Sequence, residues 1–240
     1  MIASSNGPGT NNRARGNYSE LFFGPLPGVT EEVRALKELL PQASFLTKES
    51  ATKAAVEKLS APSILHIATH GFFLSVPGAL ATGPASEPRA LPTHPNRSSK
   101  IDNPLLRSGL ALAGANQRSD GILTALEASG LNLWGTKLVV LSACDTGIGE
   151  IKSSEGVYGL RRSLVLAGAE SQTMSLWAVS DRSTRDLMIS YYKNLTNGQG
   201  RGDSLRQAQL QILKSKSHSH PYYWASFIQT GEWANLEGKR

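Results

Sequence analysis

A cysteine and a histidine follow the two most apolar segments of this 240-residue sequence. His70 comes directly after the run SILHIAT at 63–69, and Cys144, the only cysteine, comes directly after KLVVLSA at 137–143. A thiolate can attack an amide carbonyl while a neighbouring imidazole takes and returns the proton. The backbone N–H groups of Gly71 and Cys144 could stabilise the resulting oxyanion, because a glycine lets the carbonyl approach closely. These residue types therefore predict nucleophilic cysteine chemistry.

The two apolar runs predict the elements that hold this pair. Each run is short, uninterrupted and rich in β-branched residues, which is typical of a strand buried on both faces of a parallel sheet. The carboxyl ends of parallel strands meet at one edge, so we expect His70 and Cys144 to lie close together there. Weaker strand patterns occur at 110–113, 172–177 and 225–230.

Helical patterns separate these strands. They begin near Thr30, Ser50, Val157, Asp181 or Ser183, and Asp203. Strands that alternate with helices form right-handed βαβ crossovers. The sequence therefore predicts an α/β protein with three layers, in which a mostly parallel sheet carries helices on both faces.

Two polar segments interrupt this alternation. Residues 1–19 are poor in large apolar side chains and are predicted to be a flexible tail or linker before a single domain at 20–240. Residues 75–104 hold half of the 12 prolines without any periodicity, which predicts a loop insertion.

The composition excludes several classes of function. Hydrophobic residues make up 40% of the chain and charged residues 18%, which is globular composition. A net charge of +6 does not identify a nucleic-acid binder, and no direct nucleic-acid partner is expected. No apolar run reaches the ~20 residues of a membrane span, so no membrane association is expected. A single cysteine excludes a disulfide framework and is consistent with a reducing, cytoplasmic location.

Neither a cofactor nor a metal ion is expected. The sequence contains no glycine-rich phosphate loop of the Walker or dinucleotide-binding type. His94, His218 and His220 lack a carboxylate or cysteine at ligand spacing. His66, four residues before His70 on the same predicted strand, is interpreted as a core histidine.

Several segments together resemble the CHAT domain, a caspase-like peptidase domain usually found beside tetratricopeptide repeats. They include ILHIATHGFF, NPLLRSGLALAGAN, LVVLSACDTGIGE and SLWAVSDRST, and the similarity extends from about Gly24 to Trp233. The resemblance implies a caspase–separase fold and a regulated cysteine endopeptidase with His70 as catalytic histidine and Cys144 as nucleophile. It also implies a protein substrate and a regulatory partner or repeat domain of the tetratricopeptide type.

The segment SLWAVSDRST is similar to the separase segment beside the substrate's P1 residue. Trp177 and Asp181 are therefore expected at the substrate, with Asp181 favouring cleavage after arginine or lysine. Asp181 could instead only cap the helix that follows, and Asp145 is a rival for the acidic role.

Two other functions stay open at this stage. The first is a catalytically silent interaction module on the same fold. The second is a flavodoxin-like binder of a nucleotide or flavin, which needs a phosphate loop that LTKESAT at 46–52 matches poorly. The intact His70, Gly71 and Cys144 favour the enzyme.

Overall fold

A computed structural model gives the fold of the chain. It describes residues 1–4, 18, 21–74, 103–117, 119–142, 144–145, 155–177, 179–215 and 218–239.

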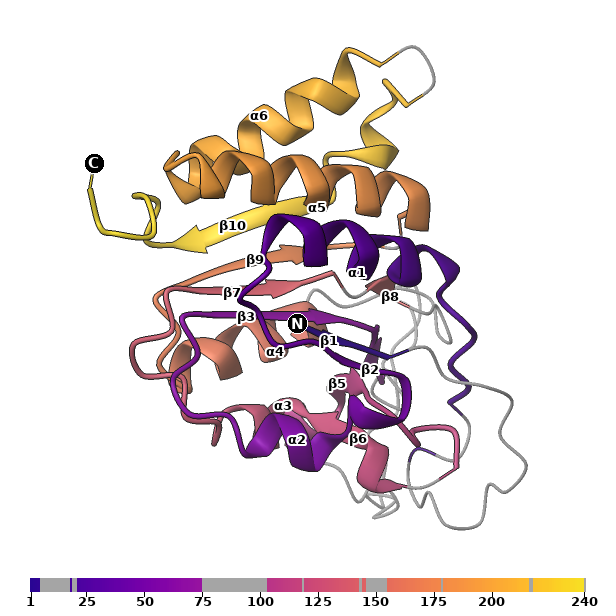
Figure 1. Cartoon of the computed structure of the whole chain (residues 1–240). Helices are drawn as coiled ribbons and strands as arrows, with labels where there is room; N and C mark the ends of the chain where they lie inside the picture. Colours follow the sequence, from indigo (N-terminus) through magenta and orange to yellow (C-terminus); the bar gives the residue numbers. More distant parts are fainter. Residues whose placement is uncertain are drawn as a thin grey trace, which may run out of the picture.

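A six-stranded sheet forms the centre of the molecule (Figure 1). Its strand order is β10-β9-β7-β3-β1-β2, and each neighbouring pair is parallel except β10 with β9. The strands are β1 (Ile2–Ala3), β2 (Leu46–Thr47), β3 (Ile64–Ala68), β7 (Leu138–Leu141), β9 (Ser171–Ser175) and β10 (Phe227–Gly231). The two strands that precede His70 and Cys144 lie side by side in the middle of this sheet, as β3 and β7.

A second, four-stranded sheet continues from the first and has the order β6-β5-β4-β8. Its strands are β4 (His70–Phe73), β5 (Ser108–Ala111), β6 (Ile122–Thr124) and β8 (Cys144–Asp145). Strand β4 pairs antiparallel with β5 and parallel with β8. The chain therefore leaves β3 and β7 at the same end of these neighbouring strands. The two segments that follow pair with each other in the small sheet, as β4 and β8.

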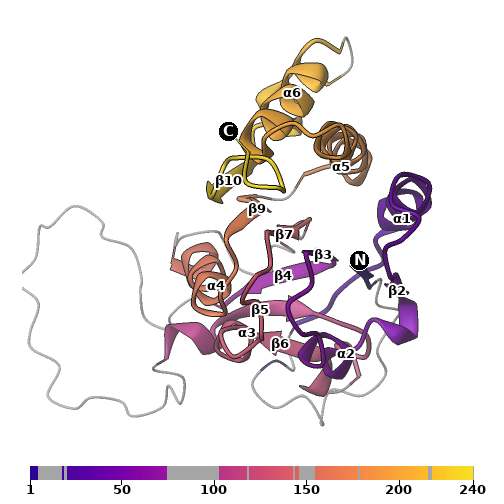
Figure 2. The ribbon, with the colours of Figure 1, turned by 60° about the vertical axis from the view of Figure 1, so that its left-hand side comes forward.

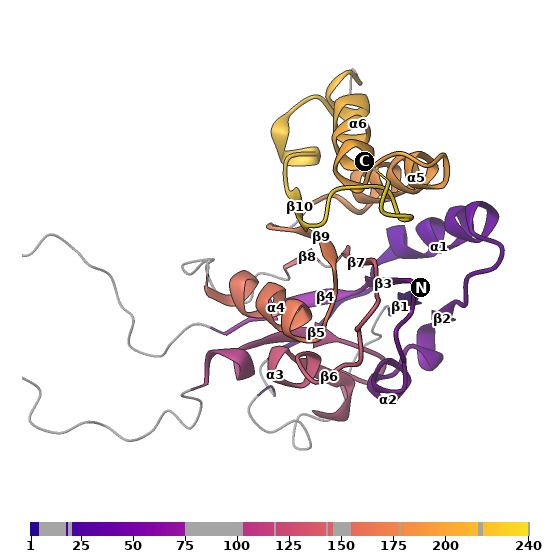
Figure 3. The ribbon, with the colours of Figure 1, turned by 90° about the vertical axis from the view of Figure 1, so that its left-hand side faces the viewer.

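Helices cover both faces of the large sheet (Figures 2 and 3). One face carries α1 (Pro27–Leu39), α5 (Asp181–Thr196) and α6 (Arg201–Leu213), and the other carries α2 (Lys53–Glu57), α3 (Ala125–Ala128) and α4 (Glu155–Leu166). Alternation along β7 explains the two layers, because Leu138 and Val140 pack with the first group whereas Val139 and Leu141 pack with the second. Short 3-10 helices complete the fold at Lys48–Ser50, Pro104–Leu106, Ser119–Gly121 and Pro221–Tyr223.

This architecture confirms the predicted α/β class with three layers, but some boundaries differ. Helix α1 begins at Pro27 and not near Thr30. Proline suits the first turn of a helix, since its missing N–H group would have no partner inside the helix there. The strand predicted at 110–113 is β5, which pairs antiparallel in the small sheet.

The two interrupting segments lie largely outside the described residues, which include only 1–4, 18, 103 and 104 of them. Residues 1–4 depart from the predicted tail, because β1 pairs with both β3 and β2 and its two side chains are buried. A two-residue strand is too short to show a hydrophobic period in the sequence. None of the helices within the described residues is long and apolar enough to cross a membrane.

Candidate active site

The small sheet brings the backbones of His70 and Cys144 directly opposite each other. They are register partners in the parallel pair of β4 and β8, and Gly71 and Asp145 are the next partners. A single residue, Thr69, separates β4 from β3, and its hydroxyl donates to the carbonyl of Ala111 on β5. Short connections therefore fix both chain segments where they leave the large sheet.

The imidazole of His70 has a defined proton arrangement. Its Nε2 lies 2.7 Å from the carbonyl oxygen of Gly24. A carbonyl oxygen only accepts, so Nε2 carries the proton and Nδ1 of the neutral ring holds a free electron pair. His70 is 4% exposed, and among the described residues its Nδ1 has no hydrogen-bond partner. This ring can act as a base through Nδ1.

A segment that the sequence does not single out holds this ring in place. The ring of Phe23 stacks on His70 with centroids 5.8 Å apart. The side-chain amide of Asn116 fixes the backbone of Phe23 twice, accepting from its N–H at 2.9 Å and donating to its carbonyl at 2.7 Å. Asn116 thereby positions the adjoining Gly24 carbonyl that orients the histidine. An asparagine after a strand usually indicates only a turn, so sequence reasoning missed this role.

The surroundings shift the pKa of His70 in opposing directions. Burial lowers the pKa below its ordinary value, because the charged imidazolium loses hydration, and this effect is the largest. The hydrogen bond to Gly24 and the negative charge of Asp181 both act to raise the pKa. The net direction is downward, so the ring is neutral at neutral pH.

The carboxylate of Asp181 lies close enough to His70 for its negative charge to act on the pKa of the imidazole. It also connects two helices. It is the first residue of α5, and its Oδ2 accepts from the N–H of Gly28 in the first turn of α1 at 3.3 Å. A small cavity beside Asp181 is lined by Thr69 and Ser142, which lie next to the two strand ends. The carboxylate thus adjoins the edge that carries His70 and Cys144, and it also caps the neighbouring helix.

Trp177 lies between the end of β9 and the α5–α6 layer. Its indole N–H donates to the carbonyl of Tyr222 at 3.4 Å, and its ring packs against the core of that layer. Trp177 is therefore held mainly by side chains and backbone of the layer that α5 belongs to.

The model of the CHAT domain matches residues 3–232 of this chain. The chain belongs to the CHAT domain family. The match covers both strand ends, the Gly24–His70 contact and Asp181, so it includes every residue of the site described above.

Two curated relatives of this CHAT domain are the human and mouse forms of one protein. The chain is 26% identical over 217 residues to tetratricopeptide repeat protein 28 of Homo sapiens and 28% identical over 230 residues to tetratricopeptide repeat protein 28 of Mus musculus. In each case 88% of this chain is matched but only 9% of the relative. The CHAT domain thus aligns with a small part of much longer repeat proteins.

His66 belongs to a buried polar cluster behind the active site of the CHAT domain. Its Nδ1 bonds the hydroxyl of Tyr192 at 3.0 Å, and its Nε2 lies 2.9 Å from the hydroxyl of Ser142 and 3.2 Å from the carboxylate of Glu32. The interpretation as a core histidine therefore agrees with its surroundings. Ser142 precedes Cys144 by two residues, so this cluster also fixes the segment that leads to Cys144.

The other two histidines that the structure describes make contacts near the end of the chain. His94 is outside the described residues, and His218 and His220 contact Tyr223 and the backbone of Tyr222. Within the part of the chain that the structure describes, no three or more metal-ligating side chains form a group.

Proposed function

We propose that this CHAT domain is a cysteine endopeptidase that cleaves a protein substrate by means of a Cys144–His70 dyad. The observation that carries the proposal is the register of β4 and β8, which sets His70 opposite Cys144 while Gly24 leaves Nδ1 as the basic nitrogen. A base needs a free electron pair within reach of the proton that it takes. The family match supports the same assignment.

The reaction follows from these two groups. Nδ1 of His70 takes the proton of the Cys144 thiol, and the thiolate attacks the carbonyl carbon of the scissile peptide bond. The tetrahedral oxyanion then collapses to a thioester as the imidazolium returns the proton to the leaving amine. Water then attacks the thioester carbonyl while Nδ1 takes one of its protons. The C–S bond breaks, the imidazolium returns the proton to the sulfur of Cys144, and the carboxylic acid product leaves.

Two further parts of the proposal concern the substrate. The N–H groups of Gly71 and Cys144 stabilise the oxyanion, since two donors aimed at the developing charge are the usual need of acyl transfer. Asp181 binds an arginine or lysine side chain at P1, because a carboxylate beside the reacting groups pairs with a cation. Trp177, four residues before Asp181, is proposed to contact the substrate as well.

The relatives' name supports a regulatory partner for the domain. Both relatives are tetratricopeptide repeat proteins that extend far beyond the matched region, so we propose that a repeat array or a partner that resembles one controls the peptidase. A reactive thiol on a chain with a single cysteine is consistent with a cytoplasmic location.

Peptide cleavage by matched variants tests the proposal. The purified chain is incubated with a proteome-derived peptide library, and cleavage sites are read by mass spectrometry for wild type, Cys144→Ala, His70→Ala and the control His218→Ala. We expect each dyad variant to lose activity at least about a thousandfold, with the double variant hardly worse than either single one. The control should keep wild-type activity.

Two outcomes, one from peptide cleavage and one from thiol labelling, would contradict the proposal. Full cleavage by folded Cys144→Ala would exclude the dyad. An unreactive wild-type thiol, shown by equal labelling of wild type and His70→Ala with a thiol-directed probe, would favour the catalytically silent interaction module.

A further inference from the structure

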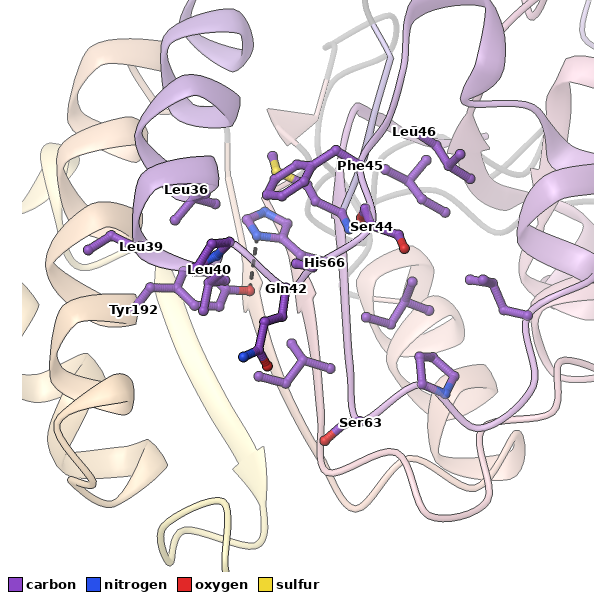
Figure 4. A pocket seen from close by; sticks show the side chains of 18 residues that line it. Leu36, Leu39, Leu40, Gln42, Ser44, Phe45, Leu46, Ser63, His66 and Tyr192 are labelled. Carbon is purple, nitrogen blue, oxygen red and sulfur yellow. Dashed lines mark hydrogen bonds between the residues drawn. The ribbon is translucent and has the colours of Figure 1, made fainter.

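An apolar pocket lies at the opposite end of β3 from the active site (Figure 4). Its volume is about 720 Å³, and it is lined by the end of α1, the segment that leads to β2 and the first residues of β3. Ile64 and His66 of β3 line the pocket and precede His70 by six and four residues, roughly 20 Å and 13 Å at the rise of an extended strand. A molecule in this pocket would not compete with a peptide at His70.

The walls of the pocket are aliphatic or aromatic. Leu36, Leu39, Leu40 and Phe45 line it together with Ile64. Interiors of proteins are close-packed and contain few voids larger than a water molecule. An apolar space of this size falls instead within the range of small-molecule sites, about 300–1,000 Å³.

The floor of the pocket is polar but already partnered. Tyr192 and His66 are buried there, and they bond each other as Figure 4 shows. The second ring nitrogen of His66 faces Ser142 and Glu32 behind the floor. A ligand therefore need not supply a hydrogen bond at the floor.

The rim carries neutral polar groups. Gln42, Ser44 and Ser63 are exposed there, and none of the lining residues that the structure describes is an aspartate, glutamate, lysine or arginine. The amino group of Met1 also borders the pocket and donates to the carbonyl of Ser44 at 2.6 Å. Burial lowers the pKa of this amino group, because the charged form loses hydration, so its uncharged form is favoured at pH 8. An ion in such a pocket would lose hydration without gaining a charged side-chain partner.

We propose that this pocket binds one uncharged, mainly apolar small molecule whose single polar end lies at the rim. The occupant follows from the size of the space, its hydrocarbon walls and the neutral side chains that border it. The site is separate from the peptidase centre, so its occupancy can be measured in Cys144→Ala as well as in wild type.

Titration with the neutral dye Nile red tests the site. Its fluorescence should rise and saturate at one dye per chain for wild type. Ile64→Trp, which fills the pocket, and Ser63→Trp, which covers its exposed rim, should each weaken binding at least tenfold. Circular dichroism shows that each variant is folded, and Ser63→Trp decides the matter if Ile64→Trp does not fold.

A control variant separates this pocket from other apolar surface. Trp134 is 77% exposed and lies outside the pocket, so Trp134→Ser should bind the dye within twofold of wild type. The proposal is wrong if wild type shows no saturable binding. It is also wrong if Trp134→Ser loses the dye while both folded pocket variants retain it.

Competition tests the charge of the occupant. At pH 8 and below micellar concentrations, 1-decanol should displace Nile red, and the decanoate anion of the same length should need at least a tenfold higher concentration. Equal displacement by both compounds would overturn the assignment of an uncharged ligand.

Discussion

The chemistry of the site depends on a single nitrogen of His70. The carbonyl of Gly24 fixes the proton on Nε2, and Phe23 holds the ring by stacking against it. The free Nδ1 is then the base that the proposed reaction needs. Nδ1 has no hydrogen-bond partner within the described part of the chain, and a buried nitrogen in that state has a free-energy cost of about 1–3 kcal/mol. Such costs concentrate at functional sites.

The lowered pKa of His70 predicts a pH-dependent contribution to stability. The unfolded chain protonates this histidine near pH 6.5, whereas the folded chain does so only at lower pH. Proton uptake therefore favours unfolding as pH falls below about 6.5. Urea unfolding at pH 8 and pH 5 should show that His70→Gln loses less stability than wild type over this interval, by about 1.4 kcal/mol for each pH unit by which the pKa is lowered. An equal loss in both proteins would contradict the direction of the shift.

Asp181 predicts a preference for arginine at P1. Asp181→Asn should cost on the order of 2–5 kcal/mol in kcat/KM for a fluorogenic peptide with arginine at P1, and little for the leucine peptide. Gly28→Ala should act in the same direction, because an added Cβ would lie 2.4 Å from the Cβ of Asp181 and displace it. Asp186→Asn, on the same helix, is the control.

A different outcome would assign Asp181 to the fold alone. If both peptides lose activity equally while α1 separates from α5, then the bond to Gly28 is the role of this carboxylate.

At the scale of elements, residues 21–26, which lead into α1, contact the turn that follows β5. Asn116 follows β5 and bonds both backbone groups of Phe23, although the two residues are 93 positions apart. The Gly24 carbonyl is therefore held by the small sheet that also carries His70 and Cys144.

Asn116 is thus a positioning residue for His70. Asn116→Ala should lower kcat about tenfold to a hundredfold with little change in KM, since a small misplacement of a catalytic group is costly. Loss of the Gly24 bond also removes an interaction that raises the pKa of His70, so the acidic limb of the pH profile should move to lower pH.

The matched control for this prediction is Asn132→Ala. Asn132 bonds the hydroxyl of Ser60 at 3.1 Å on the exposed surface, so its loss should affect neither kcat nor the pH profile. If Asn116→Ala only loses stability, by about 1–3 kcal/mol, and keeps the wild-type pH profile, then its role is structural.

At the scale of the whole molecule, the CHAT domain corresponds to 9% of each relative. A domain inside a long repeat protein is suited to control by the rest of the chain. If the proposed regulation holds, the 240-residue chain alone should have at least about tenfold lower kcat/KM than the same chain joined to the repeat array of a relative, since loops at a proposed peptidase site can be ordered by a partner. Steady-state cleavage of one peptide by both forms measures the ratio, with Cys144→Ala in each form as background. Equal rates would exclude this regulation.

The sequence by itself determined the central part of the fold, and it also indicated the two residues of the proposed dyad. The runs before His70 and Cys144 specify β3 and β7, because a short uninterrupted run with β-branched residues is typical of a strand buried on both faces of a parallel sheet. The periodic apolar residues of α5 and α6 specify one helical layer in the same local way. These features depend on neighbours along the chain, so they can be recognised in one sequence.

Only the tertiary structure decided how the histidine is held. The bond from His70 to Gly24 joins residues 46 apart, and the clamp of Asn116 on Phe23 joins residues 93 apart. The place of β1 between β3 and β2, and the cap that Asp181 provides for α1, likewise depend on segments far apart in the sequence. A single backbone carbonyl or a two-residue strand leaves no pattern in the sequence, because its partner is selected by the packing of the whole domain.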